Sequence, residues 1–213
     1  TGGGLNATVT SNSPYTALGS ATIAGTAVVS GNVKLEYSTT GSGGTYVTLG
    51  TGANNVTVSG GAFSYSWSVP NAIGSNIYVK VTDLNSTANA ISGNGTTPIT
   101  IKAGITGVTV QAPTNGSFYT VGEVRNVSWT TAGTVGLVKL EYYTGIYSAA
   151  GAPDIVASTA NASPYSWTVP DYINTGVKVV VSDADAGHPA ASGESSAFTI
   201  RGALTITTPS ELY

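Results

Sequence analysis

The chain repeats its own sequence, and this repetition limits its fold more than any other feature. The block at 33–37 (VKLEY) returns unchanged at 138–142, and the block at 65–70 (YSWSVP) returns at 165–170 as YSWTVP. Further matching blocks follow in the same order in both halves. Collinear blocks of this kind predict a duplicated domain of about 100 residues.

Each repeated block alternates apolar and polar residues, as a β-strand does. In the first VKLEY block, Val33, Leu35 and Tyr37 share one face of a strand. Lys34 and Glu36 occupy the opposite face. Turn-forming segments rich in Gly, Ser and Asn separate the blocks, and no amphipathic helical period is present. About seven short strands per repeat predict an antiparallel β-sandwich.

The repeat pattern predicts two domains, at 1–102 and 103–201. A third segment, 202–213, opens with Leu204 and Ile206 alternating with Thr, and it matches the start of the second repeat. A lone strand needs partners for its backbone groups and its apolar face. We therefore expect this segment to open a further repeat or to be a strand exchanged with a neighbouring subunit.

Very few residues carry a charge. Charged residues make up 8% of the 213 residues, the net charge is −3, and there is no Cys. The 41% hydrophobic content indicates a folded chain, whose surface must be built from hydroxyls, amides and Gly. Glycans or neighbouring subunits would cover such a surface. No basic patch for nucleic acid and no apolar run that could span a membrane is present.

The order of the blocks resembles a known repeat. The second repeat has Ala112-Pro113, Val121-Gly122 and Val127-Ser128-Trp129 ahead of VKLEY. This layout resembles the immunoglobulin-like repeat of bacterial and archaeal multi-domain surface proteins, related to the fungal Ser/Thr-rich GPI-anchored cell-wall family. The resemblance implies an all-β protein with two tandem immunoglobulin/fibronectin-III-like antiparallel sandwiches, located outside the cell or on its surface. The first repeat lacks the early Trp.

No catalytic constellation is visible in the sequence. His188 is the single imidazole, lies in a turn after a strand, and has no counterpart in the first repeat. None of the common nucleophile, metal-hydrolase or nucleotide-binding motifs occurs. We therefore predict that the chain is not an enzyme, with no catalytic residue and no cofactor.

Asp183 and Asp185 form a candidate Ca²⁺ site, because Ca²⁺ prefers carboxylate and carbonyl oxygens. The alternative, which we favour, is that an Asp after a strand caps the following turn. Tyr143 and Tyr147 lie around an insertion that only the second repeat has. These rings are candidate contacts for another subunit or for sugar rings, and cross-strand packing is the alternative.

Asn-x-Ser/Thr sequences give candidate glycosylation sites in turns. They are Asn6, Asn55, Asn85, Asn94 and Asn115.

Together these features predict an extracellular structural protein that self-assembles into a surface filament, sheath or layer. The expected partner is another copy, joined by head-to-tail strand addition through Leu204 and Ile206. The alternative is an adhesin, or a carbohydrate-binding module of a larger surface protein or enzyme.

Overall fold

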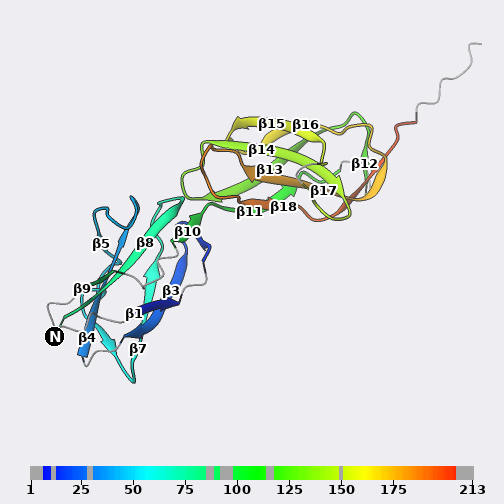
Figure 1. Cartoon of the computed structure of the whole chain (residues 1–213). Coiled ribbons are helices and arrows are strands. Elements are labelled where there is room, and N and C mark those ends of the chain that lie inside the picture. Colours follow the sequence, from blue (N-terminus) through cyan, green and yellow to red (C-terminus); the bar gives the residue numbers. More distant parts are fainter. Residues whose placement is uncertain are drawn as a thin grey trace, which may run out of the picture. The chain divides into compact units, whose positions relative to one another are not determined.

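The computed structural model describes residues 7–10, 13–27, 31–84, 89–91, 98–113, 118–148 and 151–204. Every regular element within these ranges is a β-strand, so the predicted all-β fold class is confirmed (Figure 1). None of the described residues forms a helix long and apolar enough to cross a membrane.

The strands are short, as the closely spaced turn signals predicted. The first group is β1 (Ala7–Thr10), β2 (Tyr15–Thr16), β3 (Ser20–Ala27), β4 (Gly31–Ser38), β5 (Val47–Thr48), β6 (Val56–Val58), β7 (Ala62–Ser68), β8 (Gly74–Asp83), β9 (Asn89–Ile91) and β10 (Ile99–Lys102). The second group is β11 (Gly104–Val110), β12 (Tyr119–Thr120), β13 (Val124–Ala132), β14 (Leu137–Thr144), β15 (Asp154–Ala160), β16 (Tyr165–Thr168), β17 (Asn174–Asp183), β18 (Ser192–Glu194) and β19 (Phe198–Arg201).

The chain forms two compact units. Unit 1 comprises 1–104 together with 131–135 and 185–191. Unit 2 comprises 105–130, 136–184 and 192–213. The domain limits predicted from the repeats, 1–102, 103–201 and 202–213, stay a prediction.

Unit 1 contains two sheets. One has the strand order β1-β3-β7, and the other has the order β2-β10-β8-β4-β5, with β6 paired to β4 and β9 paired to β8. The first strand of the repeat is divided between the two sheets, since β1 pairs with β3 and β2 pairs with β10. Pro14 lies in the break, where a residue without an N–H suits the change of partner.

Unit 2 repeats this topology. Its sheets have the orders β11-β13-β16 and β12-β19-β17-β14-β15, and β18 pairs with β17. Strand orders of this kind are those of immunoglobulin-like sandwiches. One detail differs from a purely antiparallel sandwich: β2 pairs with β10, and β12 with β19, in parallel. The divided first strand causes this, because its second half runs beside the last strand of the unit in the same direction.

The apolar faces predicted from the alternation meet in the core. Val33 and Leu35 on β4 are fully buried, and Trp67 on β7 is 1% exposed. Tyr37 is partly buried against the same cluster. Strand alternation therefore predicts the core of unit 1 correctly at these positions.

The outer face of β4 and of β14 differs from the expected polar surface. Glu36 is 8% exposed, and its counterpart Glu141 in unit 2 is 1% exposed. Glu36 pairs with Lys34 at 2.7 Å and with Lys80 on the neighbouring strand β8 at 2.9 Å. Two carboxylates are thus buried on a face that alternation alone assigns to solvent. Lysines of the same sheet cover Glu36, and Tyr147, which follows β14, contributes to the cover of Glu141.

The tryptophans differ in how their indole N–H groups are satisfied. Among the described residues, Trp67 Nε1 and the nearby hydroxyl of Tyr15 are buried without a hydrogen-bond partner. Their rings pack edge to face with centroids 5.8 Å apart. In unit 2, Trp129 Nε1 instead donates to Asn161 Oδ1 at 2.8 Å. A buried donor without an acceptor reduces stability, whereas a paired one adds to it.

We therefore expect Trp129→Phe to cost about 1 kcal/mol more stability than Trp67→Phe, because only the first substitution removes a hydrogen bond. Both rings are almost fully buried, at 4% and 1% exposed, so the loss of apolar area is matched. Urea unfolding followed by near-ultraviolet circular dichroism measures both costs. A larger cost for Trp67→Phe would contradict the assignment.

Candidate functional site

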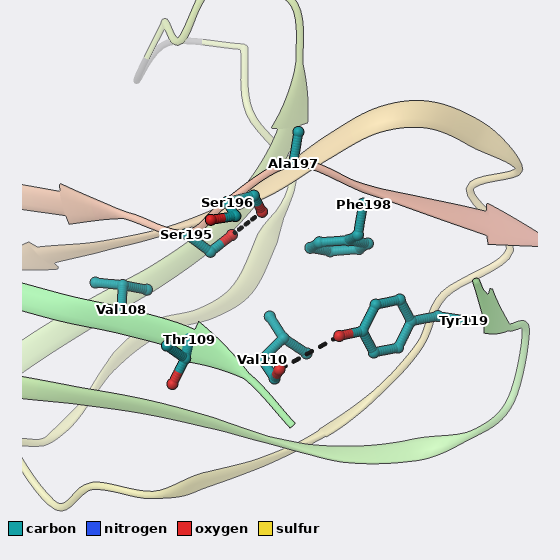
Figure 2. A pocket seen from close by; sticks show the side chains of 8 residues that line it. All are labelled: Val108, Thr109, Val110, Tyr119, Ser195, Ser196, Ala197 and Phe198. Carbon is teal, nitrogen blue, oxygen red and sulfur yellow. Dashed lines mark hydrogen bonds between the residues drawn. The ribbon is translucent and has the colours of Figure 1, made fainter. Parts of the chain in front are cut away.

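A groove opens at one edge of the unit 2 sandwich. It is lined by eight residues from three segments, and Figure 2 shows the two valines of β11 facing the segment that leads into β19. We call this cavity the edge groove. Its lining residues are Val108, Thr109, Val110, Tyr119, Ser195, Ser196, Ala197 and Phe198.

The path of β11 sets up the first wall. Ile105 and Val108 are both buried, although they are three positions apart and a regular strand would place them on opposite faces. Gly107 between them has a φ of 62°, a left-handed conformation that glycine adopts without strain. This irregularity turns Val108 back toward the core. Within the described part of the chain, β11 is the outermost strand of its sheet, so one of its edges has no strand neighbour.

Gly193 on β18 closes the sandwich beside the start of β11. A methyl group on Gly193 would lie 2.5 Å from the carbonyl oxygen of Ile105 and 3.1 Å from Val108 Cγ2. Only a glycine permits so close an approach between the two sheets. The sandwich is therefore tightly closed at Ile105 and opens toward Val110.

The second wall is held in place by Ser195, which is 5% exposed. Its backbone N–H donates to the Val179 carbonyl at 2.9 Å, and its hydroxyl accepts from the Val179 N–H at 3.0 Å. The same hydroxyl donates to the Ser196 carbonyl at 2.9 Å. These bonds attach the segment to β17 and leave Ser196 and Ala197 exposed at the rim.

Tyr119 forms the far end of the edge groove. Its hydroxyl donates to the Val110 carbonyl over 3.3 Å, and its ring packs edge to face on Phe198. Burial raises the pKa of Tyr119 above its ordinary value, and the charge of Arg125 offsets part of that rise. The phenol is therefore a neutral hydrogen-bond donor at physiological pH.

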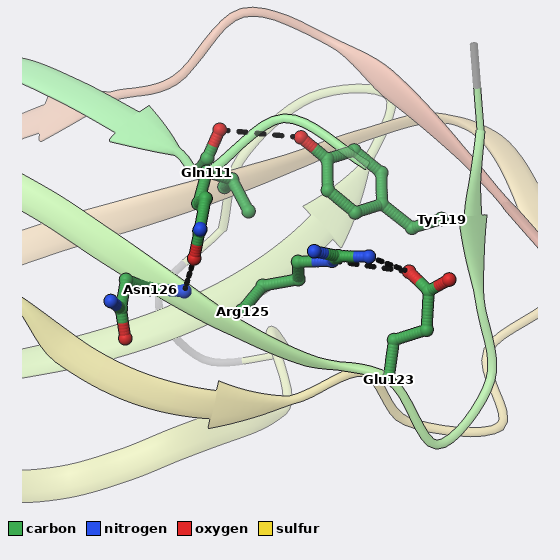
Figure 3. Close-up of polar contacts among 6 residues, drawn as sticks. Gln111, Tyr119, Glu123, Arg125 and Asn126 are labelled. Carbon is green, nitrogen blue, oxygen red and sulfur yellow. Dashed lines mark hydrogen bonds and ion pairs between the residues drawn. The ribbon is translucent and has the colours of Figure 1, made fainter. Parts of the chain in front are cut away.

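A charge pair lies behind Tyr119 (Figure 3). Arg125 is 9% exposed and donates from Nε and Nη2 to one oxygen of Glu123, at 3.1 and 2.9 Å. These bonds lower the pKa of Glu123. The pair is neutral overall, and the backbone of Asn126 beside it is bonded to Gln111. The lining of the edge groove itself carries no formal charge.

The edge groove is small. It encloses about 160 Å³, whereas pockets for cofactors or drug-sized ligands measure roughly 300–1,000 Å³. Its apolar lining is made of valine and aromatic side chains with Ala197 at the rim, and its polar groups are hydroxyls and backbone. Such a space fits one or two apolar side chains of an extended strand better than it fits a free small molecule.

The predicted aromatic pair lies elsewhere, on the outer face of β14. Tyr143 is 6% exposed and donates to Glu194, while Tyr147 donates to Glu141 at 2.6 Å. The two rings pack together with centroids 5.2 Å apart. Both phenols are thus directed at carboxylates of the same unit. Their role as contacts for sugar or for another subunit stays a prediction.

Lysines complete a group of paired side chains that we call the outer-face cluster. Its members are Lys139, Glu141, Tyr143, Tyr147, Asp154, Lys178 and Glu194. Lys139 pairs with Glu141 at 2.8 Å and with Asp154 at 2.9 Å, which raises the pKa of Lys139. Lys178 pairs with Glu194 at 2.6 Å. Burial and then the Glu194 carboxylate raise the pKa of Tyr143 to about 12.

Of the two Ca²⁺ candidates, Asp185 lies beside His188, the imidazole of the turn that follows the strand. Asp183 belongs to unit 2, and Asp185 and His188 belong to unit 1. All three residues are half-buried. His188 Nδ1 is 3.7 Å from Asp185 Oδ2. Ca²⁺ takes six to eight oxygen ligands, so two carboxylates and an imidazole do not complete a Ca²⁺ site by themselves.

Most of the other predicted positions lie outside the described residues. Asn55 is exposed in a turn, and its Oδ1 accepts a hydrogen bond from Asn32 Nδ2 at 2.7 Å. The side-chain nitrogen of Asn55, to which a glycan would be attached, takes no part in this bond. Leu204 is 98% exposed. The positions outside the described residues are Asn6, Asn85, Asn94, Asn115 and Ile206.

Solved structures similar to this chain include the FN1–FN3 domains of chicken CNTN1, with 14% identity, 90% of this chain and 68% of that chain covered, and a TM-score of 0.32. A tetra-tandem repeat from the extending region of a large adhesion protein is 18% identical, with 92% of this chain and 49% of that chain covered, and the TM-score is 0.32. A Ca²⁺-stabilized adhesin that helps an Antarctic bacterium bind ice is 19% identical, with 95% of this chain and 50% of that chain covered, and the TM-score is 0.29. The chain thus spans about half the length of these two.

No protein-family model and no curated protein matches the sequence. The assignment of the fold therefore rests on the strand order of the two units.

Replacing Gly193 by Ala tests how the sandwich is closed. We expect Gly193→Ala to lower the stability of unit 2 by roughly 1–3 kcal/mol, because the backbone oxygen of Ile105 must move away from the new methyl group. Gly151→Ala is the matched control, since nothing lies within 4 Å of a methyl group there. Thermal unfolding measures both variants, and equal stability of the two would contradict the close approach.

The outer-face cluster predicts a loss of stability in acid. The Lys178 ammonium, and then the Tyr143 hydroxyl, hold the pKa of Glu194 below its unfolded value. A lowered carboxylate pKa contributes stability above the unfolded pKa of about 4.3, and this contribution disappears as the pH falls through the folded pKa. Glu194→Gln should make the melting temperature of unit 2 depend less steeply on pH between about pH 5 and 2. An unchanged slope would show that the pairing contributes nothing.

Proposed function

We propose that this chain is an extracellular structural protein whose copies associate into a surface filament, sheath or layer. The observation that carries the proposal is the edge groove, an uncharged opening lined by apolar side chains and hydroxyls. It lies beside an edge of β11 that has no strand neighbour among the described residues. Sheet edges of this kind pair with other chains unless charge, proline or a covering segment prevents it. Ser196 and Thr109, both exposed at the rim, provide no charge that would do so.

The composition of the whole chain supports the same proposal. Monomeric proteins usually remain dispersed because charges of both signs cover about a quarter or more of their surface. Here 8% of all residues are charged, and several of these pair with one another within unit 1 and within unit 2. A surface of hydroxyls and amides is compatible with extensive contact between subunits.

The groove is poorly suited to catalysis. General acid–base chemistry needs a group that exchanges a proton near the working pH, most often an imidazole or a carboxylate. The lining of the edge groove contains neither, and its single phenol is held neutral. The proposal therefore assigns the groove a role in association.

Electron microscopy and analytical ultracentrifugation of the untagged chain test the proposal. We expect regular filaments, tubes or sheets, and a sedimentation coefficient that rises with protein concentration. Thr109→Lys should weaken association roughly tenfold or more, because a lysine on this edge must be buried or left unpaired when another chain docks.

Thr22→Lys is the matched control, since Thr22 is equally exposed but lies on β3, whose two edges are both paired. This variant should associate like the original chain. Isolated particles at every concentration, together with saturable binding to a glycan surface, would replace the proposal with the adhesin or carbohydrate-binding alternative.

A further inference from the structure

We infer that the edge groove is the acceptor for a β-strand donated by a second copy of this chain, and that the donor is the segment beginning at Leu204. This inference rests on the proposed function, because it names the contact by which copies would associate. The acceptor is described by the structure. The donor is identified by its sequence and by the exposure of its first apolar residue.

The acceptor presents two backbone edges at once. On one side lies the edge of β11 at Val108–Val110, which no strand of the described ranges accompanies, and on the other lies the segment Ser195–Phe198. A strand placed between them would have hydrogen-bond partners along β11 and would direct alternate side chains into the apolar lining. Strand addition of this kind gains affinity from the backbone and specificity from pockets that receive every second side chain.

The donor has the side chains that this lining requires. In an extended strand of the sequence Leu-Thr-Ile-Thr at 204–207, the two aliphatic side chains would share one face and the two hydroxyls would share the other. Four extended residues span about 13 Å, comparable with the three residues of β11 and four of the opposite wall that line the groove. Neither the donor segment 204–207 nor the lining is charged, so docking would bury no unpaired ion.

Leu204 is available to a partner. It is 98% exposed in the described structure, although it is a large aliphatic residue. Burying such a side chain yields about 1.5–3 kcal/mol, which makes it a suitable anchor for an interface. The segment could in principle return to the edge groove of its own chain. On that path, however, β12 already pairs with β19 at Arg201.

The same geometry favours donation between copies. Leu204 follows Arg201 by three residues, which reach at most about 10 Å back along the chain. The far wall of the groove, Ser195–Phe198, ends at the first residue of β19, whereas Leu204 comes after the last residue of β19. A donor that enters a neighbouring groove meets no such restriction. Head-to-tail donation of this kind is heterologous and extends without closing unless the rotation between copies forms a ring.

Disulfide trapping tests the contact directly, because the natural chain contains no Cys. Two single variants, Thr109→Cys and Thr205→Cys, are mixed and oxidised under mild conditions. We expect a disulfide-linked heterodimer from this mixture, and none from the control mixture of Thr22→Cys with Thr205→Cys. A double variant that closes only within one chain, without intermolecular links, would overturn the inference.

A peptide experiment separates the acceptor from the assembly. The full chain carrying Leu204→Asp and Ile206→Asp is labelled with ¹⁵N and titrated with a peptide of residues 203–209. We expect saturable shifts at the amides of Val108–Val110 and Ser195–Phe198, and binding weakened roughly tenfold or more by aspartate at both aliphatic positions of the peptide or by Thr109→Lys in the acceptor.

The outcomes distinguish this inference from the proposed function. Regular assemblies without the Thr109–Thr205 disulfide, and without peptide shifts at the groove, would overturn the donor–acceptor contact and leave the structural role standing. Peptide binding at the groove by a chain that never assembles would support the contact and remove the filament, sheath or layer. The disulfide together with assembly supports both.

Discussion

The need to satisfy backbone hydrogen-bonding groups at the edges of a sheet governs this structure. In unit 2 the two sheets approach so closely at Gly193 and Ile105 that a methyl group would not fit between them. Three residues farther along β11 the sheets separate, and the edge at Val108–Val110 has no strand beside it in the described residues. The edge groove follows from this change, since one end of the sandwich is closed by backbone contact and the other is left to an incoming strand.

Several of the few charges of the chain pair with one another on the outer faces of the central strands. Both repeats place a Lys-x-Glu pair on the outer face of their central strand, and in both the glutamate is almost fully buried. Unit 1 adds Lys80 to the carboxylate, whereas unit 2 adds the Tyr147 hydroxyl. The same repeated motif thus buries an acid with different partners. Because these ions are used within each unit, the rim of the groove is left to hydroxyls and methyl groups.

The repeat blocks and their alternation predicted the all-β fold and the inward face of β4. They did not predict the burial of Glu141, because its cover comes from Tyr147 in an insertion without a repeat counterpart. They also missed the groove, since its walls at 108–110 and 195–198 are far apart in sequence and meet only through strand order. Gly107 was a signal that β11 is irregular, but a glycine in a strand does not reveal which side chain it redirects.

Hydrogen exchange measured on dispersed and assembled protein shows whether β11 gains a strand partner on assembly. Amides that are open to solvent in separate chains become protected when a strand pairs with them. The account predicts that assembly slows exchange at Val108–Val110 and in the segment that follows Gly202, while the amides of β3, already paired on both edges, keep their rates. Assembled material in which β11 exchanges as fast as in separate chains would contradict it.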